Sequence, residues 1–139
     1  MIKVFLDSDI ILDLFAHREP FYIHAAKLFT LIDKNKIEAF TSPVVYANLH
    51  NLLARYKSAS FALNSLRKLR TLVKIAAADE KVIDLSLNAR FKDFEDSIQY
   101  YTAKTMDIKY IITRNKSDYK KAEIEVCTAE EFLKLMDLS

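Results

Sequence analysis

The sequence predicts an α/β fold, in which helices alternate with the strands of a mainly parallel sheet. Short apolar runs of strand length alternate along the chain with longer segments whose apolar residues recur at helical spacing. The 139 residues are 51% apolar, which is enough for one domain with a buried core. We therefore expect a single domain over residues 1–139.

Five short apolar runs predict the strands. A continuous apolar run bounded by polar residues is typical of a strand that is buried on both faces of a parallel sheet. The first run has only Lys3 as an interruption. The expected strands lie at 2–6, 37–41, 72–76, 110–113 and 123–127.

Helical periodicity and capping residues predict the segments between the strands. Pro20 fits the first turn of a helix, and Ser42 followed by Pro43 fits a helix start. Thr128 with Glu131 has the spacing of a capping box. The expected helices lie at 8–15, 20–32, 43–56, 60–69, 80–88 and 93–106, with a last helix after residue 128.

Composition excludes several classes of protein. The chain has no glycine, which phosphate-binding P-loops and dinucleotide-binding loops require. The lone Cys127 cannot form an internal disulfide and fits a reducing compartment. No apolar run approaches the roughly 20 residues that span a bilayer, and the N-terminus has no signal-peptide pattern. We expect a cytoplasmic protein without a membrane partner.

The stretch VFLDSDIILDLF places three aspartates beside an apolar strand. Desolvating a carboxylate costs free energy unless something compensates it. Asp7 directly follows the strand, where it could cap a helix or face a ligand site. We expect Ser8 or Asp9 to cap the following helix, with Asp9 otherwise at the rim of the site. Asp13 is expected to make structural contacts with Arg18.

Further acids begin the helix expected at 93–106. Asp93, Glu95 and Asp96 lie in its first turn, where acids interact favourably with the helix dipole. Asp93 and Asp96 also share a face, and like charges at this spacing repel unless a cation lies between them. Both interpretations remain open from position alone.

Polar residues at other strand ends and on one helix face point to the same edge of the sheet. Thr113, Asn115 and Asp118 follow the fourth strand, and Asn48 interrupts the apolar stripe of the helix after Pro43. A buried amide needs hydrogen-bond partners or lines a polar cavity. Together these residues indicate carboxylates converging on one pocket, which is the setting for Mg²⁺ or Mn²⁺. The three histidines lack zinc-ligand spacing.

Four segments, in this order and spacing, resemble the PIN domain family, which includes the VapC-like toxin ribonucleases. The segments are FLDSDIILDLFAHREPF, SPVVYANL, FKDFEDSIQYYTAK and YIITRNKSDY. The resemblance implies a three-layer α/β/α sandwich with a mainly parallel sheet of about five strands. It also implies an acidic pocket that binds Mg²⁺ or Mn²⁺ and hydrolyses RNA. A small antitoxin protein and a homodimer are the implied partners.

The resemblance assigns roles to individual residues. Asp7 and Asp96 match metal-binding, catalytic aspartates of the family, Asp118 is chosen as the last acid of the site, and Asp93 is a neighbour that could assist. Asn48 and Asn115 stand where the family commonly has acids, and with Thr113 they would support the site. The residues expected to contact the RNA backbone are Arg114, Lys116, Lys120 and Lys121.

Two other functions remain open from the sequence. The first is a PIN-like module that binds RNA or protein but has lost catalytic acids. The second is a haloacid dehalogenase-like phosphatase, because VFLDSD also resembles that family's strand and Asp-x-Asp pair. In that case Asp7 would be the nucleophile and Asp9 the acid/base.

Overall fold

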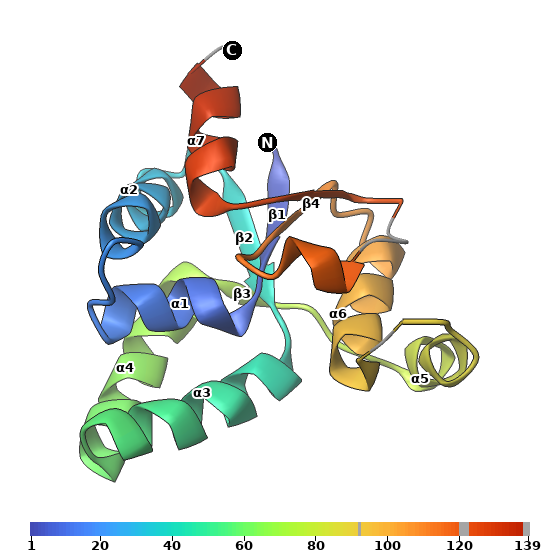
Figure 1. The fold of residues 1–139 in the computed structure, drawn as a ribbon, viewed down its shortest axis with the longest axis horizontal. Coiled ribbons are helices and arrows are strands. Elements are labelled where there is room, and N and C mark those ends of the chain that lie inside the picture. Colours follow the sequence, from blue (N-terminus) through green and yellow to red (C-terminus); the bar gives the residue numbers. More distant parts are fainter. Residues whose placement is uncertain (92, 120–122, 138–139) are drawn as a thin grey trace.

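The computed structural model describes residues 1–91, 93–119 and 123–137 of the chain. At its centre lies a sheet of five parallel strands in the order β3-β2-β1-β4-β5 (Figure 1). The strands are β1 (Lys3–Leu6), β2 (Glu38–Thr41), β3 (Lys74–Ile75), β4 (Tyr110–Ile112) and β5 (Glu125–Cys127). The predicted parallel sheet of about five strands is confirmed.

The strand order reverses at β1. The chain runs outward from β1 to β2 and β3, then crosses back to place β4 on the other side of β1. In the register of the β1–β4 pair, Leu6 lies opposite Ile112, and the Asp7 amide donates a hydrogen bond to the Ile112 carbonyl over 3.1 Å. The carboxyl ends of β1 and β4 therefore meet at the switch point of the sheet, where α/β proteins usually bind ligands.

Helices cover both sides of the sheet, which confirms the three-layer α/β/α prediction. The helices are α1 (Ser8–Phe15), α2 (Tyr22–Asp33), α3 (Pro43–Tyr56), α4 (Ala59–Leu72), α5 (Glu80–Leu87), α6 (Phe94–Thr105) and α7 (Ala129–Asp137). A 3₁₀ helix, η1 (Lys116–Tyr119), lies between β4 and β5. Figure 1 shows α1 to α4 gathered on one side of the strands, and α5 with α6 on the other.

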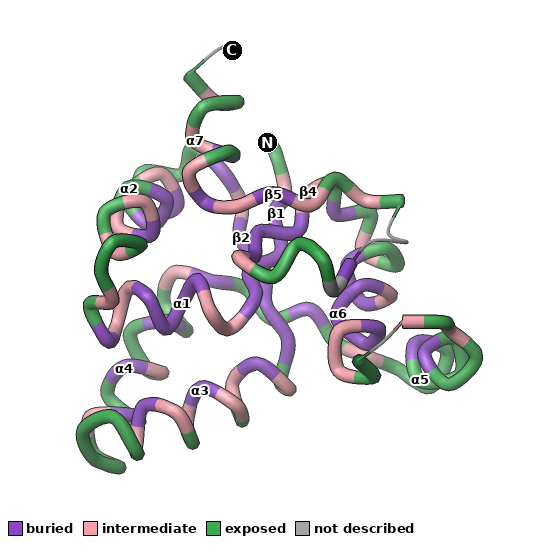
Figure 2. Tube along the Cα trace, in the orientation of Figure 1, coloured by how far each residue is buried: buried purple, intermediate pink, exposed green. Residues whose placement is uncertain are grey.

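The core follows the central strands. Val4, Phe5 and Leu6 of β1 are fully buried, as are Ile111 and Ile112 of β4. Figure 2 shows the buried residues along the strands and on the inward sides of the helices that pack against them. Burial of these apolar side chains is what holds the two strand ends, and the side chains that follow them, in place.

Two helix starts are as predicted. The Ser42 hydroxyl accepts a hydrogen bond from the Val45 amide over 3.3 Å, and Pro43 is the first residue of α3. At α7, the Thr128 hydroxyl accepts from the Glu131 amide, and the Glu131 carboxylate accepts from the Thr128 amide. This reciprocal pair is a capping box.

The start of α1 differs from the prediction. Asp7 is the N-cap, with extended backbone, and its side chain accepts from the Ser8 amide, while Ser8 is already helical. The strand β1 ends at Leu6, as predicted, and the Asp7 amide still bonds the Ile112 carbonyl of β4, so no linker separates the strand from the helix.

Two other local expectations were wrong, and one element was not expected. Pro20 lies before α2, because a turn closed by the Tyr22 amide and the Arg18 carbonyl delays the helix. Leu72 ends α4 instead of starting β3. The 3₁₀ turn η1 was not foreseen, because residues 116–119 have no apolar periodicity. Within the described residues, no helix has the length and apolar character needed to cross a bilayer.

Candidate active site

Asp7 lies at the junction of β1 and β4. Its side chain is 6% exposed. One oxygen, Oδ1, accepts from the Ser8 amide over 2.8 Å, and Oδ2 accepts from the Thr113 hydroxyl over 2.9 Å. Asp7 therefore caps α1, which is one of the two roles left open by the sequence, and its other oxygen bonds the residue that follows β4.

Asp9 lies beside Asp7 in the same pocket. Its Oδ2 accepts from the Arg114 backbone amide over 2.9 Å and lies 3.4 Å from the Thr113 hydroxyl. Its Oδ1 is buried and has no hydrogen-bond partner of normal geometry among the described residues. Burial, with the neighbouring charge of Asp7, raises the pKa of Asp9 to about 6. Asp9 is therefore a pocket residue and does not cap the helix.

Glu95 brings α3 and α6 to the pocket. The Asn48 side-chain amide of α3 donates a hydrogen bond to Glu95 Oε1 at the start of α6. Burial, followed by the charge of Asp93, raises the pKa of Glu95. Burial raises the pKa of Asp7 most, and the Glu95 charge raises it further. From the sequence, Glu95 was expected in an acidic helix turn but not in the site. The feature that could have indicated Glu95 is Asn48, because a partly buried amide needs a hydrogen-bond acceptor.

Tyr119 and Gln99 complete the described part of the pocket, and neither was predicted. The Tyr119 hydroxyl lies 3.4 Å from Asp96 Oδ1 and 3.4 Å from Gln99 Oε1. Gln99 in turn hydrogen-bonds Asp7, which lowers the pKa of that carboxyl. Burial and then the charges of Asp7 and Asp96 raise the pKa of Tyr119, so the phenol stays protonated. No spacing rule marks a tyrosine and a glutamine as members of an acidic site.

Other predicted site residues have side chains that are either exposed or outside the part of the chain that the structure describes. Asp93 is exposed and caps α6 by accepting from the Asp96 amide over 3.1 Å. The Asn115 amide donates to the Thr113 hydroxyl over 3.1 Å, and its side chain is exposed. Asp118 belongs to η1, and its side chain lies outside the described part, as do Lys120 and Lys121 entirely. Ligand roles for these residues stay predictions.

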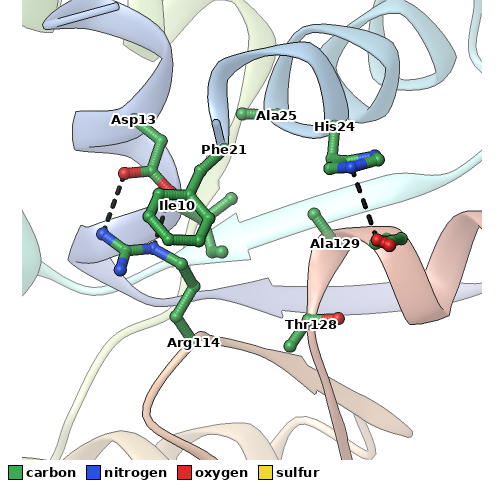
Figure 3. A pocket seen from close by; sticks show the side chains of 9 residues that line it. Ile10, Asp13, Phe21, His24, Ala25, Arg114, Thr128 and Ala129 are labelled. Carbon is green, nitrogen blue, oxygen red and sulfur yellow. Dashed lines mark hydrogen bonds and ion pairs between the residues drawn. The ribbon is translucent and has the colours of Figure 1, made fainter. Parts of the chain in front are cut away.

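Arg114 and Asp13 form a second polar centre beside the pocket. Asp13 is 1% exposed, and its carboxylate accepts two bonds from Arg114, over 2.9 and 3.0 Å. Arg18 donates to the same carboxylate over 3.0 Å, which confirms the structural contact predicted between them. Figure 3 shows Phe21 over the Arg114 guanidinium, at 3.9 Å from the ring centroid. A cavity of about 160 Å³, bordered by Ile10, lies here.

Both basic residues near the site that the structure describes hold acidic partners. Arg114 forms an ion pair with Asp13. Lys116 contacts both carboxylate oxygens of Glu131 at 2.9 Å, and this ion pair connects η1 with α7. Contacts of these two side chains with RNA would therefore compete with ion pairs inside the protein. Their assignment to the RNA backbone stays a prediction.

The pocket has the donor chemistry of a hard dication. In the part of the chain that the structure describes, no three His, Cys, Asp or Glu side chains gather closely enough to hold a metal ion. Even so, the buried carboxylate of Asp7 lies beside the half-buried Asp9, Glu95 adds a third negative charge, and among the described residues the buried Oδ1 atom of Asp9 has no hydrogen-bond partner of normal geometry. Carboxylate oxygens with uncompensated charge suit Mg²⁺ or Mn²⁺. These residues fit such an ion.

The sequence also matches known proteins. Residues 3–117 match a family model described as PIN domain. A protein named Ribonuclease VapC1, from Aquifex aeolicus (strain VF5), is 31% identical over 135 residues, which cover 94% of this chain and 92% of the relative.

Solved structures share the fold. VapBC2 from Rickettsia felis, bound to a DNA fragment from its promoter, contains a chain with a TM-score of 0.68 and 15% identity, covering 91% of this chain and 97% of that one. Mycobacterium tuberculosis VapC20, described as a Sarcin-Ricin loop cleaving toxin, has a TM-score of 0.63 and 16% identity. That match covers 78% of this chain and 86% of VapC20. At such identities the likeness shows the fold alone.

Proposed function

Because the chain belongs to the PIN domain family, we propose that it is an endoribonuclease that hydrolyses RNA phosphodiester bonds, the toxin of a toxin–antitoxin pair. The observation that carries the proposal is the placement of Asp7, which is buried at the β1–β4 switch point. Asp9 and Glu95 lie close enough for their negative charges to repel that of Asp7. A relative named as a ribonuclease, 31% identical over nearly the whole chain, supports the same activity.

We further propose that the pocket works with Mg²⁺ or Mn²⁺, held by Asp7 and Asp96 together with Asp118, whose side chain lies outside the described part, while Glu95 adds negative charge beside them. When bound, such an ion polarises a phosphoryl oxygen and lowers the pKa of an attacking water. The chain's own side chains orient these acids. The Ser8 amide and the Thr113 hydroxyl hold the two oxygens of Asp7.

The family assignment separates the alternatives. It excludes the haloacid dehalogenase-like phosphatase, because residues 3–117 match the PIN domain instead. A PIN-like module without activity would keep this fold but fail to cleave RNA. Asn48 supports the active alternative, since its amide holds Glu95 where the resemblance predicted an acid.

An antitoxin is the proposed protein partner. Solved structures that share the fold include a toxin–antitoxin complex from Klebsiella pneumoniae and FitAB bound to a DNA fragment. We propose that a small antitoxin silences this chain, and that the chain forms a homodimer. Co-purification with the product of the neighbouring gene, followed by light scattering, would test both.

The decisive experiment is RNA cleavage by the purified chain with Mn²⁺, with Mg²⁺ and with EDTA. Asp7→Asn should reduce metal-dependent cleavage by more than the about 10- to 100-fold typical of residues that only support a ligand. Its melting temperature in EDTA should not fall, because asparagine can still cap α1 and the buried charge is removed. Asp33→Asn, at the exposed end of α2, is the matched control and should cleave as the parent does.

Cleavage by Asp7→Asn at the parent's rate would overturn the proposed site. An inactive parent that still binds RNA would point to the binding module instead. Cleavage that is equally fast in EDTA would remove the metal from the proposal.

A further inference from the structure

Besides the Thr113 hydroxyl, which bonds Asp7, the hydroxyl of Tyr119 also lies among the acids of the pocket. Tyr119 ends η1, is 2% exposed, and places its hydroxyl 3.4 Å from both Asp96 Oδ1 and Gln99 Oε1. A phenol has one proton to donate, and a carboxylate is the stronger acceptor because the bond is charge-assisted. The hydroxyl is therefore directed toward Asp96.

Gln99 extends this contact to the other side of the pocket. It is 1% exposed on α6, one turn after Glu95; its Oε1 lies 3.4 Å from the Tyr119 hydroxyl, and its side chain interacts with Asp7 and lowers the pKa of that carboxyl. Two uncharged side chains in contact with each other thus lie against the acids, Tyr119 against Asp96 and Gln99 against Asp7. The ring of Tyr119 belongs to the buried core, and Phe91 packs edge-on against it at 6.2 Å between ring centroids.

We propose that the Tyr119 hydroxyl is a positioning group, which, together with Gln99, orients the carboxylates of Asp96 and Asp7 for a divalent cation. This inference rests on the proposed metal-dependent function. A lysine or arginine at this place would also orient the acids, but it would neutralise them and repel the cation. Uncharged donors fix the direction of the carboxylates and leave their negative charge available to the ion.

The test is metal binding by Tyr119→Phe, which keeps the ring that packs on Phe91 and removes the hydroxyl. Chelator-stripped protein is titrated with Mn²⁺, and the apparent Kd is read from the rise in melting temperature and from calorimetry. We expect about ten-fold weaker Mn²⁺ binding, with the melting temperature in EDTA near that of the parent. RNA cleavage at limiting Mn²⁺ should fall, and excess Mn²⁺ should restore most of it.

Tyr101→Phe is the matched control. Tyr101 lies on α6 and also packs near Phe91, at 6.3 Å between ring centroids, so it tests loss of a hydroxyl from the same aromatic cluster. It should bind Mn²⁺ as the parent does. Gln99→Met, of similar length, should weaken Mn²⁺ binding too. Combined with Tyr119→Phe it should add less than the sum of the two, because both act on the same connection.

The outcomes separate this inference from the proposed function. A parent that binds Mn²⁺ and cleaves RNA, with Tyr119→Phe unchanged in Mn²⁺ affinity, would overturn the inference alone. A large loss of melting temperature in EDTA for Tyr119→Phe would make the hydroxyl a structural element and would also overturn it. A parent that neither binds Mn²⁺ nor cleaves RNA would overturn both.

Discussion

Asn48 of α3 donates its side-chain amide to Glu95 of α6, so the asparagine that stands where the resemblance predicts an acid holds an acid supplied by another helix. The pocket thereby keeps a carboxylate at this place, although the residue that carries it is 47 positions away in the sequence.

Replacing Asn48 by glutamate should place two carboxylates in contact. Without metal, their repulsion and the lost hydrogen bond should lower the free energy of unfolding by about 1–3 kcal/mol. With millimolar Mn²⁺ the added charge should bind the ion more tightly, so the Mn²⁺-induced rise in melting temperature should exceed that of the parent. Asn51→Glu, exposed on the same helix, should change neither value much. Equal Mn²⁺ responses in Asn48→Glu and the parent would show that this position does not face the ion.

Asp13 should be one of the most sensitive positions for stability. It is 1% exposed and accepts bonds from Arg18 and Arg114, so Asp13→Ala leaves a partly buried guanidinium without its partner. We expect a loss of about 3–5 kcal/mol in the free energy of unfolding, measured by urea denaturation. Asp33→Ala should lose less than about 0.5 kcal/mol. If Asp13→Ala lost as little free energy of unfolding as this control, water would be solvating the two arginines well enough to replace their bonds to Asp13.

Asn35 has a left-handed backbone in a chain without glycine. Its φ is 58° directly after the C-cap of α2, where glycine is the usual residue. Asn35→Gly should therefore stabilise the protein by about 0.5 kcal/mol, and Asn35→Ala should destabilise it by about 1 kcal/mol. At Asn51, within α3, the order should reverse, with alanine best and glycine worst. The same order at both positions would contradict the left-handed conformation.

Cys127 should be inert in the native protein. Burial, with the charges of Glu131 and Glu125, raises the pKa of its thiol to about 12 from an ordinary value of 9.0. Between these two values the native state keeps a proton that the unfolded state releases, so Cys127 should make stability fall as the pH rises above about 9. A disulfide reagent at pH 8 should react quickly with the Cys127 thiol in urea and very slowly with it in the absence of urea. Rapid reaction without urea would contradict the burial of Cys127, and Cys127→Ser gives the background rate.

The sequence predicted the parts of the structure that depend on local patterns. The central strands appear as apolar runs, and both the Ser42 cap and the Thr128–Glu131 capping box follow from spacing alone. Asp7 could be placed because it directly follows a strand at the point where parallel strands end.

Contacts between distant segments could not be predicted in this way. Whether the Arg114 side chain faces solvent or Asp13 depends on how α1 packs beside β4. The residues next to Arg114 in the sequence do not predict that packing. Glu95, Gln99 and Tyr119 join the site through the packing of α6 and η1. The sequence therefore indicates which edge of the sheet bears the site, while tertiary packing decides which side chains meet there.

The position of β1 in the middle of the sheet has a consequence for protein synthesis. The Asp7–Thr113 hydrogen bond joins residues 106 positions apart, and β4, which Thr113 directly follows, is made after β1, β2 and β3. A nascent chain on the ribosome exposes Asp7 early but cannot build the pocket until β4 has emerged and docked against β1. Truncated or stalled translation products would lack the assembled pocket. A cell that makes this proposed nuclease is thus exposed to its activity only from nearly complete chains.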